Sequence, residues 1–217
     1  MKSVLIIGMG SFGHHLCRCL AELGCEIMIA DKDERALEDM LPYVVSAKIA
    51  DCTNVEVLKS FDVGSFDVCF VCISGDFQAG LEITNQLYEL EAKRVISKAD
   101  RDIEYKFLKA NGATAVVYPE KDIAHRVAVR ESSDSIFDCI DLGDGCAVYE
   151  ISVKDSWIGK TIKEENFRVK HNLTILACKD KDSDKVTPII SGDYRFNAQE
   201  HILVMGNFSD IRKVTKK

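Results

Sequence analysis

The sequence opens with a short apolar run, a glycine-rich turn and a helical pattern, and this arrangement limits what the chain can fold into. Val4 to Ile7 fit a strand that is buried on both faces. Gly8, Gly10 and Gly13 then form G-x-G-x-x-G. The first glycine allows a tight turn, the second lets a pyrophosphate approach the backbone, and the third lets the helix pack closely on the strand. The stretch therefore predicts a phosphate-binding unit of an α/β fold.

The segments after the turn support this interpretation. A helical pattern with one apolar face runs from Phe12 to Leu23, and its N-terminus offers N–H groups and a positive dipole end to an anion. A second strand pattern ends at Asp31, 18 residues after Gly13, where a carboxylate can bind a ribose 2′-OH. This acid disfavours the 2′-phosphate of NADP. It does not distinguish NAD from ATP, ADP or AMP, because all of them carry that hydroxyl.

Strand and helix patterns continue to alternate up to about residue 118. We expect strands at 4–7, 25–31, 44–51, 66–74, 94–99 and 113–119, and helices at 12–23, 54–61, 77–92 and 102–112. This alternation predicts an α/β fold with a Rossmann-like, doubly wound parallel sheet. Ligands of such sheets lie beyond the carboxyl ends of the strands. The candidate contacts at these ends are Asp31, Asp51 to Thr53, Ser74 to Asp76, and Lys98.

A connecting helix is expected at residues 119–134. Pro119 suits a first helical turn, and Glu120 suits a helix N-terminus. Ile123 and Val127, with the alanines beside them, form an apolar stripe. This stripe can pack either on the sheet or against another subunit.

The sequence pattern changes after residue 134. Residues 146–153 alternate between apolar and polar, residues 156–172 resemble a turn and a short helix, and strands are expected at 173–179, 185–190 and 200–206 before a final helix from residue 208. We therefore expect a small α+β domain at 135–217. It is too small to be the usual substrate domain of a dehydrogenase.

The composition excludes several classes of protein. The 217 residues are 47% hydrophobic and 29% charged, which is enough for a real core, and no apolar run is long enough to span a membrane. No signal-peptide pattern precedes the first strand. The net charge of −7 disfavours a general nucleic-acid binder.

The nine cysteines are more typical of a reducing cytoplasm than of a disulfide framework, because the chain is a leaderless α/β protein. Cys69 and Cys72 have the spacing of a metal or redox pair. They lie on one predicted strand, however, where residues three apart point to opposite faces. We therefore interpret them as core residues.

Several stretches of the chain together resemble one family. They are IIGMGSFG with IADKDE, ADCTN at 50–54, VISKA, VYPEKDIA, and in the second domain SWIGKTIKEENFRVKHNLTILACK with ILVMG. In order, spacing and total length, over residues 1 to about 212, they resemble the regulatory subunits of bacterial Trk/Ktr potassium-uptake systems. In that family an RCK N-terminal domain (here 1–118) precedes an RCK, or TrkA, C-terminal domain.

The resemblance implies a cytoplasmic protein that binds ATP/ADP or NAD/NADH and regulates a membrane-embedded potassium transporter subunit of the TrkH/KtrB type at the inner face of the membrane. With the strand ends, the implied nucleotide contacts are Gly8, Gly10, Ser11, Phe12, Gly13, Asp31, Lys32, Asp51, Cys52, Thr53, Ser74, Gly75, Asp76, Lys98 and Glu120. Two positions depart from the family. Ser11 stands where some members carry a basic residue that reaches a terminal phosphate, which leaves the preference for ATP over ADP or NAD open. Gln199 and Glu200 stand where the family often has Gly-Asp.

The resemblance also implies assembly. Family members form dimers that build a ring, here expected to be an octamer, and the helix at 119–134 is the expected dimer element. Glu120 resembles a position linked to cation binding between subunits. An ordinary favourable charge at a helix N-terminus explains Glu120 equally well.

A second ligand is implied for the C-terminal domain, because one branch of the family binds cyclic di-AMP there between two subunits. The matching residues are Ile162, Asn166, Arg168 and Pro188. Arg168 would face a phosphate, Asn166 would form a hydrogen bond nearby, and Ile162 and Pro188 would flank the adenine. A solvated helix with an ordinary turn proline is the alternative.

A small NAD-dependent oxidoreductase is the alternative function. Such an enzyme needs a general acid or base beside the nicotinamide. None of the five histidines follows the carboxyl end of a predicted sheet strand. We therefore expect a nucleotide-binding regulator and not an enzyme.

Overall fold

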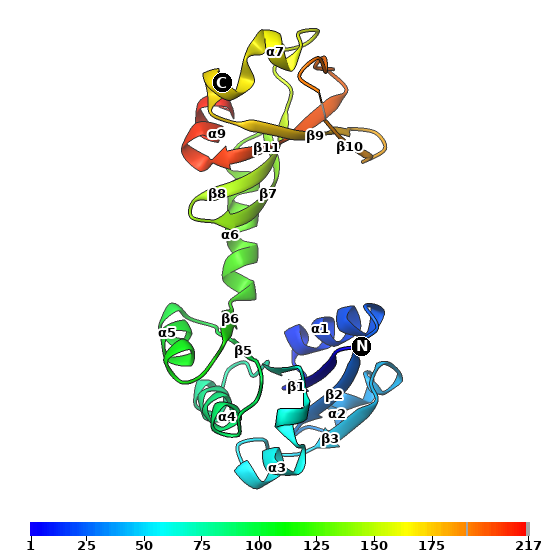
Figure 1. Cartoon of the computed structure of the whole chain (residues 1–217), viewed down its shortest axis with the longest axis vertical. Coiled ribbons are helices and arrows are strands. Elements are labelled where there is room, and N and C mark those ends of the chain that lie inside the picture. The colour runs from blue at the N-terminus through cyan, green and yellow to red at the C-terminus, as the bar shows by residue number, and fades with distance from the viewer. Residues whose placement is uncertain (190, 216–217) are drawn as a thin grey trace. The chain divides into compact units, whose positions relative to one another are not determined.

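The computed structural model describes residues 1–189 and 191–215. The last residue of the strand expected at 185–190, and the last two of the domain expected at 135–217, lie outside these described residues. The chain divides into two compact units, Met1–Glu120 and Lys121–Lys217. Each unit has a sheet of its own (Figure 1).

The first unit is built on a six-stranded parallel sheet of order β3-β2-β1-β4-β5-β6. Its strands are β1 Ser3–Ile7, β2 Glu26–Asp31, β3 Ser46–Ile49, β4 Val68–Val71, β5 Val95–Lys98 and β6 Ala115–Val117. Its helices are α1 Ser11–Glu22, α2 Arg35–Glu38, α3 Val55–Ser60, α4 Phe77–Glu89 and α5 Asp102–Ala110, with short 3₁₀ turns at Leu41–Tyr43 and Val63–Ser65. The predicted Rossmann-like, doubly wound sheet is confirmed. The strand order reverses beside β1, so the crevice for a ligand lies at the carboxyl ends of β1 and β4.

Two hydrophobic clusters cover the two faces of this sheet. Leu16 of α1 packs in one cluster with Ile6 and Ile29, whereas Leu58 of α3 and Ile83 of α4 pack in the other, which also holds Leu5 and Val71. Fully burying one such side chain contributes roughly 1.5–3 kcal/mol. Packing in these clusters holds the strands in position, and it therefore also positions the strand ends where the candidate site lies.

The buried cysteines follow the same division. Cys69 belongs to the cluster under α3 and α4, and Cys72 belongs to the cluster under α1. The two thiols therefore lie on opposite faces of the sheet, as the strand pattern predicts.

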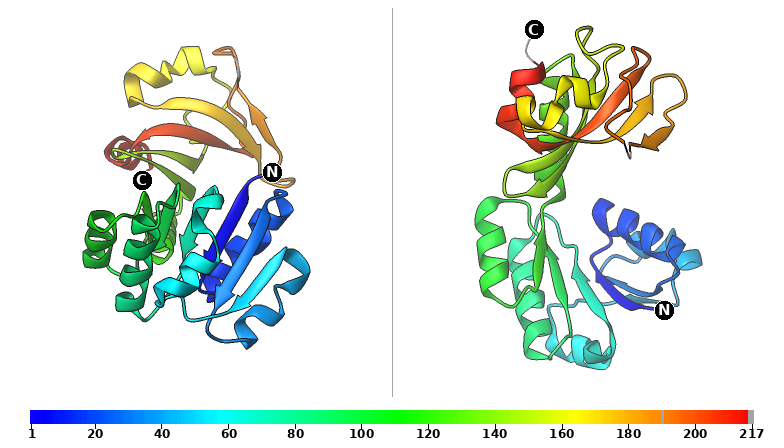
Figure 2. Two further views of the ribbon diagram at one scale, coloured as in Figure 1. Left: turned by 60° about the horizontal axis from the view of Figure 1, so that its bottom comes forward. Right: turned by 45° about the horizontal axis from the view of Figure 1, so that its top comes forward.

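The second unit holds a five-stranded antiparallel sheet of order β10-β9-β11-β8-β7 (Figure 2). Its strands are β7 Ile136–Gly143, β8 Cys146–Ser152, β9 Thr174–Asp180, β10 Val186–Pro188 and β11 Glu200–Asn207. Its helices are α7 Ile162–Glu165, α8 Phe167–His171 and α9 Phe208–Thr215, and α6 Pro119–Glu131 leads into it from the first unit. The expected small α+β domain is confirmed. Its core includes Trp157 and Phe167, whose ring centroids are 4.9 Å apart.

The structure corrects three sequence-based expectations for this unit. Strand β7 was not predicted, because bulges after Ile136 and Asp141 break its alternation and most of its side chains are exposed. The Asp144-Gly145 turn, with φ of 51° and 73°, was the missed hairpin signal. The short helix expected within 156–172 is two helices, separated at Asn166 with φ 50°. The connecting helix α6 ends at residue 131 rather than 134.

Helix α6 is exposed along most of its length within the described chain. Ile123 is 57% exposed and Val127 is 41% exposed, while Val129 is buried in the core of the second unit. Ile123 and Val127 border a cavity of about 460 Å³ together with residues of the second sheet such as Phe137, so the predicted apolar stripe is only partly covered. Among the described residues, no helix has the length and hydropathy that a membrane span requires.

Candidate functional site

The glycine turn between β1 and α1 has the geometry that its sequence predicts. Gly8 has a left-handed φ of 93°, and an added Cβ there would lie 2.8 Å from Ile73. A Cβ on Gly13 would lie only 2.3 Å from the Gly8 carbonyl oxygen. At Gly10 an added Cβ would meet no atom within 4 Å. The outer two glycines are therefore required by packing, and Gly10 leaves open space where a ligand can approach the backbone.

The start of α1 is free to receive an anion. Gly10 is its N-cap residue and provides no side-chain hydrogen bond, and no acidic residue lies in the first turn. The first N–H groups of a helix have no partner within the helix, and the helix dipole favours negative charge there. Ser11 is exposed and Phe12 is half-buried at this end.

Asp31 lies at the carboxyl end of β2 and binds the glycine turn directly. Its carboxylate accepts hydrogen bonds from the Met9 N–H at 2.6 Å and from the Asp33 N–H at 2.9 Å. The side chain therefore positions the turn, and its remaining lone pairs are available to a ribose hydroxyl. Lys32, the next residue, is exposed.

The loop after β3 forms a second polar strand end. Asp51 accepts hydrogen bonds from the Thr53 hydroxyl at 2.7 Å and from the Thr53 N–H at 3.0 Å, and these bonds lower the pKa of its carboxyl group. Cys52 is buried between them, and burial raises the pKa of its thiol to about 12. Gln86 of α4 holds this loop by donating to the Thr53 carbonyl oxygen at 2.8 Å.

The ends of β4 and β5 are joined through a buried lysine. The Lys98 ammonium contacts the Ser74 hydroxyl at 2.8 Å, Asp100 at 2.6 Å and Glu120 at 2.8 Å. Burial lowers the pKa of Lys98, but its hydrogen bonds to Asp100 and Glu120 outweigh that effect and hold the pKa above its usual value. All three of its N–H donors are thus used within the chain. The carboxylates that pair with its positive charge are those of Asp100 and Glu120, which belong to the same chain.

Asp100 is a residue at these strand ends that the sequence interpretation missed. Besides binding Lys98, it accepts a hydrogen bond from the Gly75 N–H at 3.2 Å. Burial raises the pKa of Asp100, but the bonds from Lys98 and Gly75 outweigh that effect and lower it. The signal was present, since Asp100 follows β5 in the same way that Asp51 follows β3. Asp76 accepts from the Ala79 N–H at 3.1 Å and so caps α4.

Glu120 lies in the first turn of α6, where its charge is favourable, and 63% of its side chain is exposed. Its carboxylate forms an ion pair with Lys98. Within residues 1–189 and 191–215, no group of three or more His, Cys, Asp or Glu side chains is arranged to hold a metal ion.

The four residues implied for a second ligand are only partly brought together. Ile162 and Arg168 line a cavity of about 220 Å³, with Ile189 and Phe167. Asn166 occupies the left-handed position between α7 and α8, and Pro188 is exposed on β10, and neither lines this cavity. Ile189, the neighbour of Pro188, lines the cavity.

Comparison with known proteins identifies the family. Residues 4–119 match the TrkA-N domain model, and residues 148–217 match the TrkA-C domain model. The chain belongs to this two-domain family, and the resemblance seen in the sequence is confirmed.

Two relatives match along the whole chain. The Ktr system potassium uptake protein C of Bacillus subtilis (strain 168) is 30% identical over 216 residues, which cover 100% of this chain and 97% of that protein. The Ktr system potassium uptake protein A of the same strain is 29% identical over 212 residues, which cover 98% and 95%. Both relatives are named as potassium uptake proteins, and neither name describes an oxidoreductase.

Solved structures share the fold. The GsuK RCK domain has a TM-score of 0.55 at 19% identity, and the match covers 98% of this chain and 45% of that one. The GsuK channel bound to NAD also has a TM-score of 0.55, at 20% identity, and the match covers 99% of this chain and 38% of that one. This chain therefore spans less than half the length of these structural relatives.

Proposed function

We propose that this chain is the cytoplasmic, nucleotide-binding regulatory subunit of a potassium-uptake system, and that it acts at the inner face of the cell membrane on a membrane-embedded transporter subunit of the TrkH/KtrB type. The observation that supports this most is the similarity, along the whole chain, to two proteins that are named as potassium uptake proteins. The open glycine turn supplies the site for the regulating ligand.

The ligand of the glycine turn is an adenine nucleotide, either ATP/ADP or NAD/NADH. The start of α1 receives the phosphates of the nucleotide, and Asp31 binds its ribose. The strand ends at Asp51 and Ser74 contact the rest of the nucleotide. Part of the NAD-bound GsuK channel shares this fold, which supports a dinucleotide at this place. With Ser11 in place of a basic residue, this turn supplies no cation of its own to a terminal phosphate.

The nucleotide acts as a signal and is not consumed. A ligand shifts a conformational equilibrium only by its differential affinity for the two states. Exchange of ATP for ADP, or of NADH for NAD, changes contacts at the far end of the ligand, while the glycine turn holds the near end in both cases.

Calorimetry on the full chain with ATP, ADP, NAD and NADH tests the proposal. We expect binding without turnover, and loss of regulated potassium uptake when an Asp31→Ala variant replaces the native subunit in cells. A chain that binds none of the four nucleotides, or a variant that regulates uptake as well as the wild type, would refute this function.

We further propose that the protein is a homo-oligomer, a ring of dimers with eight copies in total, in which α6 supplies a dimer contact. The exposed Ile123 and Val127 on this helix support the assignment. Light scattering should show an assembly that an Ile123→Asp variant disrupts. A strict monomer at micromolar concentration, with and without nucleotide, would contradict it.

Cyclic di-AMP is the ligand that we propose for the cavity beside Arg168. A cavity of about 220 Å³ is smaller than a typical ligand site, so a second subunit would have to supply the other half. Calorimetry on the full chain should detect cyclic di-AMP binding that an Arg168→Ala variant removes. A cation between subunits at Glu120 remains compatible with its exposed carboxylate, and it would compete with Lys98 for that group.

A further inference from the structure

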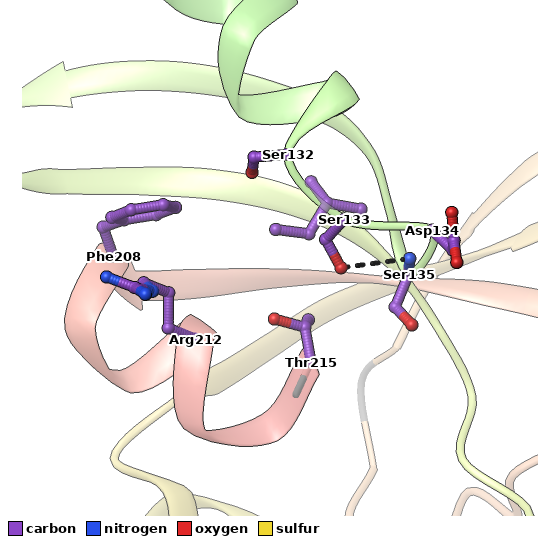
Figure 3. Close-up of a pocket in the computed structure, with 8 residues that line it drawn as sticks. Ser132, Ser133, Asp134, Ser135, Phe208, Arg212 and Thr215 are labelled. Carbon is purple, nitrogen blue, oxygen red and sulfur yellow. Dashed lines mark hydrogen bonds between the residues drawn. The ribbon is translucent and has the colours of Figure 1, made fainter. Parts of the chain in front are cut away.

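A larger cavity lies elsewhere in the second unit. The loop between α6 and β7 and the helix α9 border a cavity of about 550 Å³, which is within the range of small-molecule sites (Figure 3). Its lining includes Ser133, Ser135, Phe208, Arg212 and Thr215. It shares no residue with the glycine turn or with the cavity beside Arg168.

Arg212 gives this cavity an available positive charge. Within the described part of the chain the guanidinium forms no ion pair, and its contact is with the Phe208 ring, 6.0 Å from the ring centroid. The neighbouring Lys213 is different, since its ammonium binds Asp210 at 2.7 Å. An arginine is always charged and carries five N–H donors in a fork that matches phosphate. Arg212 can therefore bind an oxyanion without breaking an ion pair.

Of the four hydroxyl groups that line the cavity, those of Ser133 and Ser135 remain available as donors. The hydroxyls of Ser132 and Thr215 are already used, because they donate to backbone carbonyl oxygens at 2.7 Å and 3.0 Å. The Ser133 hydroxyl oxygen accepts from the Ser135 N–H at 3.2 Å, so its own proton is free to donate. The Ser135 hydroxyl forms no hydrogen bond within the described residues. Figure 3 shows Ser133 and Ser135 facing the cavity on the side away from Phe208 and Arg212.

The carboxylate of Asp134, which also lines the cavity, lies away from the Arg212 guanidinium. Asp134 already interacts within the chain. Figure 3 shows its carboxylate at the end away from Phe208 and Arg212. An anion at the Arg212 end is therefore separated from the negative charge of Asp134.

We propose that this cavity binds a phosphate-bearing small molecule, a phosphomonoester. The phosphate binds the Arg212 guanidinium at one end of the cavity, hydroxyl groups of the organic part reach Ser133 and Ser135 at the other end, and its carbon atoms pack against Phe208 and Ile136. Phosphate suits the Arg212 end, because the guanidinium carries a fork of N–H donors that matches phosphate oxygens. Such a ligand would tie the loop that follows α6 to the C-terminal helix, and so stabilise the native unit.

Binding to the full chain tests this site, with glycerol 3-phosphate, inorganic phosphate and succinate as probes. We expect glycerol 3-phosphate to bind and to raise the unfolding midpoint. Arg212→Gln should weaken it about ten- to a hundredfold, because charge-assisted hydrogen bonds are lost. Ser135→Ala should weaken it less. Lys213→Gln is the matched control, since it makes the same change of charge on the same helix and should leave binding unchanged.

The glycine turn must be excluded as the place of binding, because a helix N-terminus also attracts phosphate. A Gly13→Asp variant should still bind glycerol 3-phosphate, and Arg212→Gln should still bind adenine nucleotides. Binding that Gly13→Asp removes and Arg212→Gln retains would overturn the proposal. It would also be overturned if succinate bound as tightly as glycerol 3-phosphate, or if no phosphate probe bound at about 10 mM.

Discussion

The two ends of the ligand edge of the first sheet differ in how many of their polar groups are already used. Beside β1, the helix α1 begins without a side-chain cap, and the space at Gly10 is open. Beside β5, the Lys98 ammonium is bound by Ser74, Asp100 and Glu120. The first end is arranged to receive an anion from outside the chain, whereas the second holds segments of the chain together. A polar group at a strand end can thus either bind a ligand or hold the chain together. The two roles differ in whether the group already has hydrogen-bond partners within the chain.

The largest effect is expected at the third glycine of the turn. In Gly13→Asp, the new Cβ would lie 2.3 Å from the Gly8 carbonyl oxygen, and its carboxylate would repel the phosphates. We expect a loss of nucleotide affinity of more than about a hundredfold, with a destabilisation of about 1–3 kcal/mol from overpacking. Calorimetry and chemical unfolding measure the two effects.

Gly10→Ala is the matched control for that variant. The backbone φ of Gly10 is −73°, and an added Cβ meets no atom within 4 Å, so folding should be unaffected. Nucleotide binding should nevertheless weaken, because the methyl group occupies the space where the pyrophosphate approaches. Wild-type affinity in Gly10→Ala would show that no phosphate lies there.

Asp31→Ala should have the next largest effect on binding. The variant removes the proposed ribose contact and leaves the N–H groups of Met9 and Asp33 without their acceptor. Loss of a charge-assisted hydrogen bond costs about 1.5–3 kcal/mol, so binding should weaken roughly ten- to a hundredfold. Asp31→Asn keeps one acceptor oxygen and should lose less. Equal affinity of Asp31→Ala and wild type for every adenine nucleotide would exclude the glycine turn as the site.

Lys98→Met should affect the stability of the fold more than nucleotide binding. Because the Lys98 ammonium serves the chain's own groups, we expect a stability loss of about 1–3 kcal/mol but less than about a threefold change in nucleotide affinity. A variant that is fully stable yet binds nucleotide tenfold more weakly would make Lys98 a ligand contact and remove the contrast between the two ends.

The pH dependence of that stability loss has a defined sign. The pKa of Lys98 is raised in the folded chain, so its contribution is present below its unfolded pKa of about 10.4 and is lost as the pH rises through the folded value. The pKa of Asp100 is lowered, so its contribution is present above about pH 3.9 and is lost as the pH falls. The difference between wild type and Lys98→Met should be constant near neutral pH and should shrink at both extremes.

Glu120→Gln should have the smallest effect. Its side chain is 63% exposed, and exposed ion pairs contribute less than about 1 kcal/mol. Urea unfolding of this variant, of Lys98→Met and of the double variant separates the ion pair from the helix N-terminal charge, because the cycle isolates the pairwise interaction. A loss much larger than this would indicate that Glu120 has a further partner in the assembled protein.

The sequence predicted the parts of the structure that repeat a regular pattern. The strands of the first sheet and the glycine turn follow from buried apolar runs and from three glycines at fixed spacing. Strand β7 did not, because its bulges displace Phe137 and Leu142 from strict alternation and the strand lies at an edge. Periodicity cannot detect a strand that is neither alternating nor buried.

The candidate site was predictable in its position but not in its connections. Strand ends identify Asp31 and Lys98 as polar groups at the ligand edge, because parallel strands end together. Whether such a group is free depends on residues far along the chain, such as Glu120, which comes 22 positions after Lys98. Residues brought together only by the fold leave no local signal, and the cavity lined by Ser135 and Arg212 is of this kind.

The thiol at the ligand edge has a consequence for the cell's redox chemistry. Cys52 lies between Asp51 and Thr53, and burial, with the negative charges of Asp51 and Asp31, raises its pKa to about 12. At neutral pH only about one such thiol in 10⁵ is the reactive thiolate. An oxidant or an alkylating reagent would therefore react first with the exposed Cys19 of α1 and would leave Cys52 unmodified.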